Sequence, residues 1–202
     1  MVDPDELDAL AGRLAGRDGR GRAVMVAPVT AGAGASTVSL ALADAAARRS
    51  GRPSWLFDLD FAANPQAQRA RLNGQAFAGE PSGLRFWRAE PEGAGRLALR
   101  KLEGAAVYVT RFERDPGQVR RLTFHACAEY WRQARRACGL AVVDAPSNSA
   151  AITSLAADLD GVVLVADAAR SRRSQAEAWA DRIEEAGGRV LGVVVNRSGP
   201  AR

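Results

Sequence analysis

The chain has 202 residues, of which 47% are hydrophobic and 25% charged, and its formal net charge is +5. A chain of this length buries about 70% of the surface that it exposes when unfolded, and its apolar fraction excludes disorder as the main state. Among the 28 basic residues, 27 are arginine and one, Lys101, is lysine. Mechanisms that need a lysine elsewhere, as a phosphate clamp or a Schiff-base nucleophile, are therefore excluded.

The cellular setting is suggested by what the sequence lacks. No apolar run approaches the roughly 20 residues of a membrane span, and the acidic start has no signal-peptide core, so we expect a cytoplasmic protein. Cys127 and Cys138 are predicted about 16 Å apart along one helix, whereas a disulfide needs Cα atoms within about 7 Å. We expect both thiols to be free and buried. His125 is the only histidine, which disfavours a His/Cys metal site.

The apolar pattern predicts alternating strands and helices. Six apolar runs predict strands over residues 23–27, 54–59, 105–110, 140–143, 161–166 and 190–195. Helical periodicity predicts helices over residues 5–15, 36–49, 62–72, 118–138, 150–157 and 174–186. Continuous apolar strands that alternate with helices are typical of an α/β fold, here a doubly wound, mostly parallel sheet with helices on both faces. The expected organisation is an N-terminal helix and basic turn, residues 1–22, followed by one domain, residues 23–202, with an irregular glycine-rich insertion over about 74–104.

Three predicted strands end in features that point to one site. The first is followed by the glycine-rich segment 28–37 and a helix, and two others end in Asp58-Leu59-Asp60 and Asp144-Ala145-Pro146. A glycine loop that opens a helix is an anion site, because its backbone N–H groups point outward and the helix dipole adds positive charge. A hydroxyl of Ser36 or Thr37 could bind Mg²⁺, and the strand-end carboxylates could hold that ion or orient an attacking water.

This constellation resembles the deviant-Walker P-loop ATPases of the MinD/ParA superfamily, and most closely the cytoplasmic bacterial tyrosine kinases (CpsD/CapB-like) of exopolysaccharide synthesis. Residues 30–37 line up with the family's K-G-G-x-G-K-S-T, and residues 57–60 with Pro65 look like its I-D-x-D…P motif. Residues 143–146 are similar to the kinase subgroup's I-D-x-P, and segments 160–165 and 192–197 to its D-G-V-V-L-V…G-V-V-L-N-R ending. The match runs from Ala23 to Arg197 and implies a P-loop NTPase-like domain over residues 23–202.

The resemblance implies a site for ATP or ADP with Mg²⁺. The implied nucleotide-binding residues are Gly32, Gly34, Ala35, Ser36, Thr37 and Asn196, the last at the position that reads adenine in the family. The implied metal-binding residues are Ser36, Asp58 and Asp144, and the catalytic residues of an active protein would be Asp58, Asp60 and Asp144. The alternatives stay open: the glycines can be plain turn residues, the carboxylates solvated loop groups, and Asn196 the end of a strand.

The departures from the family pattern concern the lysines. Ala35 stands at the P-loop lysine position and Thr30 at the signature lysine position, while Lys101 lies in the insertion. Loss of one preorganised electrostatic group commonly lowers kcat by about 10²–10³-fold, so two losses predict no efficient phosphoryl transfer. Arg170, Arg172 and Arg173 are candidates for a compensating cation. The segment after Asn196 holds no tyrosine cluster and no amphipathic helix, which disfavours tail autophosphorylation and MinD-style membrane attachment.

Several functions remain open. The first is a catalytically impaired kinase-like protein that acts as a regulatory or scaffold subunit in polysaccharide biosynthesis or export. It would bind ATP or ADP weakly or not at all, dock on a membrane chain-length or export protein at the inner membrane, and could form a homodimer. The alternatives are a ParA/MinD-like partitioning or positioning protein that binds DNA, and a working ATPase with rearranged phosphate contacts.

Two side-chain groups outside the motifs have open roles. Trp55 is expected in the core, whereas Trp87, between Arg85 and Arg88, belongs either to the core or to an exposed contact surface. The arginines of the predicted helix 118–138 form either a solvated face or a surface for an anionic partner.

Overall fold

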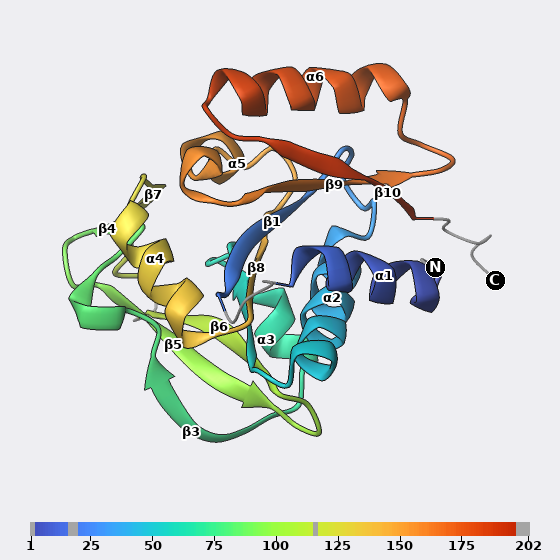
Figure 1. The fold of residues 1–202 in the computed structure, drawn as a ribbon. Helices are drawn as coiled ribbons and strands as arrows, with labels where there is room; N and C mark the ends of the chain where they lie inside the picture. The colour runs from blue at the N-terminus through green and yellow to red at the C-terminus, as the bar shows by residue number, and fades with distance from the viewer. Residues whose placement is uncertain (1–2, 16–19, 115–116, 197–202) are drawn as a thin grey trace.

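The computed structural model describes residues 3–15, 20–114 and 117–196, and an eight-stranded sheet lies at its centre (Figure 1). The strand order is β10 (Val190–Asn196), β9 (Gly161–Asp167), β1 (Arg22–Pro28), β8 (Leu140–Asp144), β2 (Ser54–Asp58), β6 (Val107–Arg114), β5 (Gly95–Leu102) and β3 (Leu72–Ala78). The first six strands are parallel, and β5 and β3 are added by antiparallel pairing. The predicted mostly parallel sheet is therefore confirmed, and its six parallel members correspond to the six predicted strands.

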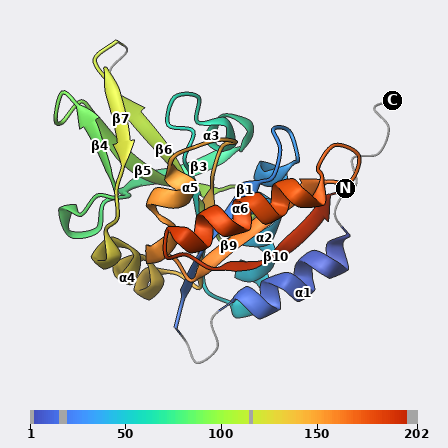
Figure 2. The ribbon, with the colours of Figure 1, turned by 90° about the horizontal axis from the view of Figure 1, so that it is seen from above.

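Helices cover both faces of the sheet. On one face α2 (Ala35–Ser50) packs on the central strands and α1 (Pro4–Leu14) packs on α2, while α4 (Ala128–Ala137), α5 (Ala151–Ser154) and α6 (Arg173–Glu185) cover the other. Figure 2 shows α6 lying across β9 and β10, with α1 far from β4 and β7. In β1, Val24 and Val26 join the α2 layer while Met25 joins the opposite one. Side chains of a strand alternate between faces, so an unbroken apolar strand buries both sides.

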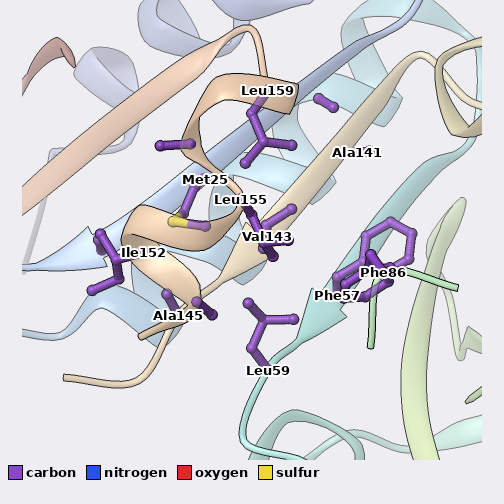
Figure 3. Close-up of a cluster of buried hydrophobic side chains, with 14 of the residues drawn as sticks. Met25, Phe57, Leu59, Phe86, Ala141, Val143, Ala145, Ile152, Leu155 and Leu159 are labelled. Atoms are coloured by element: carbon purple, nitrogen blue, oxygen red, sulfur yellow. The ribbon is translucent and has the colours of Figure 1, made fainter. Parts of the chain in front are cut away.

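Aromatic rings fill the core between β2 and α4. Phe57 is fully buried, and its ring centroid lies 5.3 Å from that of Trp131 and 6.0 Å from those of Phe86 and Tyr130. Figure 3 shows Phe57 and Phe86 beside the aliphatic cluster that α5 closes, with Ile152 and Leu155 near the β8 side chains. Edge-to-face packing of this kind stabilises the core beyond what the burial of the rings contributes.

The predicted helix over 62–72 is wrong for most of its length. Only α3 (Pro65–Arg69) is helical, and β3 begins at Leu72. Asn64 has a left-handed backbone (φ 47°), and its side chain both donates to and accepts from the backbone of Phe112 in β6, so a helix cannot run through it. The expected irregular insertion over 74–104 likewise contains most of β3, all of β4 (Trp87–Glu90) and β5, and a short turn, η1 (Pro81–Gly83). Long-range strand pairing outweighs the local glycine signal here.

The predicted helix over 118–138 is confirmed only from Ala128 onward. Before it lies β7 (Arg121–Phe124), which pairs antiparallel with β4 and opposes Phe124 to Trp87. Leu122 and Phe124 alternate toward the aromatic core, and this period of two outweighs the weaker helical spacing. Trp87 is buried, which corrects the alternative of an exposed contact surface, and Trp55 is half-buried against the core.

The remaining predictions concern four helices, the two cysteines and the ends of the chain. The helices predicted over 5–15, 36–49 and 174–186 correspond to α1, α2 and α6, and that over 150–157 is divided into α5 and η2 (Ala156–Asp158). Cys127 and Cys138 flank α4 and are free, as expected. Cys138 is buried, whereas Cys127 is only half-buried, which corrects its predicted burial. None of the described helices is long and apolar enough to cross a bilayer. Part of the basic turn and the segment after Asn196 lie outside the described residues.

Candidate functional site

The glycine-rich loop joins β1 to α2 at the carboxyl edge of the sheet. Gly32 (φ 75°) and Gly34 (φ 87°) both have left-handed backbone, which glycine adopts without strain. Gly34 is the N-cap of α2, and no side chain caps this helix end. Because β1 lies between β8 and β9, the loop is flanked by the ends of both strands. The loop therefore has left-handed glycines and an uncapped helix start, and its binding of an anion stays a prediction.

Two predicted carboxylates meet beside this loop. Asp58 ends β2 and Asp144 ends β8, and the two residues are direct partners in the parallel strand register. Both are buried, at 2% and 3% exposure. Asp144 accepts hydrogen bonds from Ser39 Oγ (3.0 Å) and Gln66 Nε2 (2.7 Å), and Ser36 also donates to it.

Gln66 connects the carboxylates to the loop. Its backbone N–H donates to Asp58 Oδ2 (2.8 Å), and its side-chain Nε2 donates both to Asp144 Oδ2 and to the Ser36 carbonyl (2.8 Å). Gln66 thus hydrogen-bonds to Asp58, to Asp144 and to the start of α2 at Ser36. Gln66 is absent from the sequence-based assignment, and the only signal for it is its position directly after Pro65 in the second motif.

Burial changes the proton affinity of these carboxyls. Burial raises the pKa of Asp58 from 3.8 to about 7, although backbone N–H groups of Gln66 and Asp60 oppose this rise. Burial also raises the pKa of Asp144, against hydrogen bonds from Gln66, Ser36 and Ser39. Asp60 is only half-buried, and its Oδ1 accepts from the Ala63 N–H at 3.0 Å, so it lies outside the buried pair.

The raised pKa of Asp58 predicts a pH-dependent stability. Between the unfolded value of 3.8 and the folded value of about 7, the folded chain holds a proton that the unfolded chain releases. The free energy of unfolding should therefore fall as pH rises through this interval, by up to about 1.4 kcal/mol per pH unit. Urea denaturation across the interval should show this slope. Asp58→Asn should reduce the slope to the part that Asp144, whose pKa is also raised, contributes.

The matched control for this titration is Asp181→Asn, which removes an exposed carboxyl of α6. It should leave the slope unchanged. If Asp58→Asn left the pH dependence of the free energy of unfolding unaltered, the pKa of Asp58 would have to be the same in the folded and unfolded chains.

The predicted metal ligands lie beside the Gln66 side chain in this arrangement. Ser36, Asp58 and Asp144 offer the oxygen donors that Mg²⁺ prefers. The amide nitrogen of Gln66, however, stands between the Ser36 carbonyl and Asp144 and takes the acceptor that a cation would use. Among the described residues no group of three His, Cys, Asp or Glu side chains could hold a metal. Metal binding by Ser36, Asp58 and Asp144 stays a prediction.

Asn196, the predicted adenine reader, lies against the loop itself. Its Nδ2 donates to the Ala33 carbonyl at 3.0 Å, and a Cβ on Gly34 would lie only 2.2 Å from that nitrogen. A side chain at position 34 would therefore displace the Asn196 amide, and the positive φ by itself favours glycine there. Its predicted contact with adenine stays a prediction.

The turn after β9 closes over the loop from the other side. Arg170 Nη2 donates to the Gly32 carbonyl (2.9 Å) and pairs with the buried carboxylate of Asp167 (2.7 Å). Ser171 Oγ lies 2.8 Å from Thr30 Oγ1. Of the three candidate arginines, Arg170 is the one that these contacts place at the loop, whereas Arg173 pairs with Glu177 and Arg172 begins α6 as its N-cap.

Lys101 cannot replace the missing lysines. It is exposed on β5, and three strands, β8, β2 and β6, separate β5 from β1. Ala35 is buried at the start of α2, and Thr30 uses its hydroxyl in the contact with Ser171. Among the described residues, Arg170 is the cationic side chain with a hydrogen bond to the loop, which extends from Pro28 to Thr37.

The arginines predicted on one helical face have mixed surroundings. Arg120, Arg121, Arg132 and Arg136 are exposed, whereas Arg135 pairs with Asp160 (2.8 Å) and donates to the Asp158 carbonyl. They divide between the β4–β7 region and α4, so they do not form a single helix face.

The loop, the strand-end carboxylates and the parallel sheet define a P-loop NTPase-like α/β protein. Among solved structures, the chain is similar to the kinase domain of the Escherichia coli tyrosine kinase ETK (TM-score 0.58, 14% identity, covering 92% of this chain and 72% of that one). It is also similar to the VpsO kinase domain (TM-score 0.62, 17% identity, 97% and 96% covered). A third is the septum site-determining protein MinD from Pyrococcus horikoshii, complexed with Mg-ADP (TM-score 0.59, 17% identity, 90% and 72% covered).

These likenesses confirm the predicted resemblance at the level of the fold: the chain has the fold shared by bacterial tyrosine kinase domains and MinD/ParA-type ATPases. No protein-family model matches the sequence, and no curated protein sequence matches it.

Proposed function

We propose that this protein is a catalytically impaired relative of the polysaccharide-associated tyrosine kinases that binds ADP or ATP weakly and uses it as a conformational ligand. The observation that carries the proposal is the composition of the loop: its left-handed glycines and uncapped helix start favour anion binding, but Ala35 and Thr30 stand where the family has lysines. Without those charges the transition state for phosphoryl transfer loses its main electrostatic stabilisation.

The buried pair beside the loop supports the same conclusion. A carboxylate that orients water or holds Mg²⁺ must be ionised and accessible. Burial raises the pKa of Asp58 to about 7, and the Gln66 amide occupies Asp144. In this arrangement Gln66 hydrogen-bonds to both carboxylates, and we expect nucleotide with Mg²⁺ to use them only after the Gln66 side chain moves aside.

A nucleotide titration tests the proposal. With fluorescent ADP and Mg²⁺ we expect weak, saturable binding, and with ATP a hydrolysis rate no greater than the uncatalysed background. The matched variant is Asp58→Ala, which should leave the hydrolysis rate at the same background level with ATP as with ATP and the wild-type protein. Robust hydrolysis by the wild-type protein that Asp58→Ala abolishes would contradict the impaired-enzyme proposal and favour a working ATPase with rearranged phosphate contacts.

The proposed cellular role is that of a regulatory or scaffold subunit in exopolysaccharide or capsule-type polysaccharide biosynthesis or export. It would act in the cytoplasm, held at the inner membrane by a chain-length or export protein, and it would be able to form a homodimer. Support comes from the likeness in fold to the ETK and VpsO kinase domains and from the Asp144-Ala145-Pro146 motif. Co-purification with a membrane protein of polysaccharide assembly would support this role, whereas salt-sensitive DNA binding would favour the partitioning alternative.

A further inference from the structure

We infer that Arg170 is the phosphate-contacting cation of the glycine loop and takes over the electrostatic role that a lysine at position 35 would have. The inference rests on the proposed function, since it concerns how the same loop binds a nucleoside diphosphate or triphosphate. Arg170 reaches the loop from the turn after β9, on the side opposite the buried carboxylates of β2 and β8.

The placement of the guanidinium group is the first argument. Nη2 donates to the Gly32 carbonyl at 2.9 Å, and both Nη atoms would lie 3.4 Å from a Cβ built on Gly32. The guanidinium thus lies directly beside the loop, at a distance where a Cβ on residue 32 would make ordinary van der Waals contact with it. A positive charge at this point adds to that of the uncapped N-terminus of α2, which follows two residues later.

The way in which Arg170 is held is the second argument. Its Nε and Nη2 both donate to Asp167 Oδ2, at 3.0 and 2.7 Å, and the Asp167 carboxylate is almost completely buried. Asp167 also accepts from the N–H groups of Ala169 and Arg170, so the turn itself is built around this carboxylate. An arginine fixed in this way loses little side-chain freedom when an anion binds.

The donors that remain are the third argument. A guanidinium carries five N–H groups, and those of Nη1 have no hydrogen-bond acceptor among the described residues. The Arg170 side chain is 58% exposed, so these donors are accessible to a ligand that enters the loop. Planar paired donors match the oxygens of a phosphate group.

Thr30 helps to hold the Arg170 turn against the loop. A lysine is absent at this position, and the Thr30 hydroxyl instead contacts Ser171 Oγ, which also accepts from the Asp167 N–H at 2.8 Å. The turn 167–171 is therefore attached to the loop at Thr30 and at Gly32, and this double attachment positions Arg170. Thr30 and Ser171 are positioning residues, because they act through the turn.

The test compares Arg170→Gln with the wild-type protein by calorimetric titration of Mg-ADP and of adenosine. We expect Arg170→Gln to weaken Mg-ADP binding about tenfold, because a charge-assisted hydrogen bond to phosphate is lost, and to leave adenosine binding unchanged. The matched control is Arg172→Gln, which removes an exposed arginine two residues away and should change Mg-ADP affinity less than about twofold.

A second measurement uses the wild-type protein and does not depend on how a variant folds. Modification by phenylglyoxal, read by peptide mass, should slow at Arg170 when Mg-ADP is added but not when adenosine is added. Arg172 serves as the internal control, and its rate should not change with either ligand.

The outcomes separate this inference from the proposed function. Equal Mg-ADP affinity in Arg170→Gln and wild type would overturn the role of Arg170 and leave the proposed function standing. A parallel loss of adenosine and Mg-ADP affinity would show that Arg170 only stabilises the loop, which also overturns the inference. Absence of nucleotide binding by the wild-type protein would overturn both.

Discussion

Replacing Phe57 with alanine should lower the free energy of unfolding by about 3–5 kcal/mol, the range found for large aromatic side chains in cores. Phe57 is fully buried in β2, and its ring makes edge-to-face contacts with four others, those of Trp55, Phe86, Tyr130 and Trp131. The cavity would lie between the sheet and α4, where large rings cannot collapse into it without leaving their rotamers.

Denaturation in urea followed by circular dichroism measures this loss. The control is Phe77→Ala on β3, because the Phe77 side chain is 52% exposed, and we expect a change of less than about 1 kcal/mol. Equal losses in the two variants would mean that the aromatic cluster is not the core of the molecule.

The second large effect is expected for Ala35→Lys, which should tighten Mg-ADP binding by about ten- to a hundredfold. The substitution places an ammonium group at the start of α2, beside the loop, where a hydrogen bond to a charged partner contributes about 1.5–3 kcal/mol. Ala35 is the first residue of α2, so the new side chain would leave the core at the helix end and extend toward the loop.

Fluorescence titration of ADP with and without Mg²⁺ measures the gain. The control Ala31→Lys adds the same charge at an exposed loop position outside the lysine register and should produce a smaller gain. If Ala35→Lys leaves the affinity unchanged, the loop is closed by something other than its missing charge, with the Gln66 contact as the first candidate.

The central strands were predictable because their apolar runs are continuous. β1, β8 and β9 are covered on both faces, so nearly every residue in them is buried and the pattern does not depend on register. The antiparallel part was not predictable in this way. β3 has mostly exposed residues, and β7 is only four residues long, so neither carries a strong local pattern. Their conformation follows from pairing with β5 and β4, partners distant in sequence.

The candidate site shows the same division. The glycines and the two buried carboxylates follow predicted strands, and parallel strands bring their ends to one edge, so their proximity could be predicted. Gln66 lies in the first turn of the short helix α3, and Arg170 lies in the turn after β9, so their positions depend on how these two turns are built. Gln66 is turned inward by the left-handed Asn64 and by the Asp58 carboxylate, and Arg170 is placed by Asp167. Neither turn has a period from which side-chain direction can be inferred.

The sequence by itself determined the α/β class, the loop between the first strand and its helix, and the absence of lysine at positions 30 and 35. These properties are local or periodic, and a linear pattern carries them. Only the tertiary structure decided that Gln66 hydrogen-bonds to both members of the carboxylate pair and that Arg170, among the arginines of the described residues, hydrogen-bonds to the loop. Gln66 and its partner Ser36 are 30 residues apart in the sequence, and Arg170 and its partner Gly32 are 138 residues apart. Such contacts are set by the packing of the whole sheet.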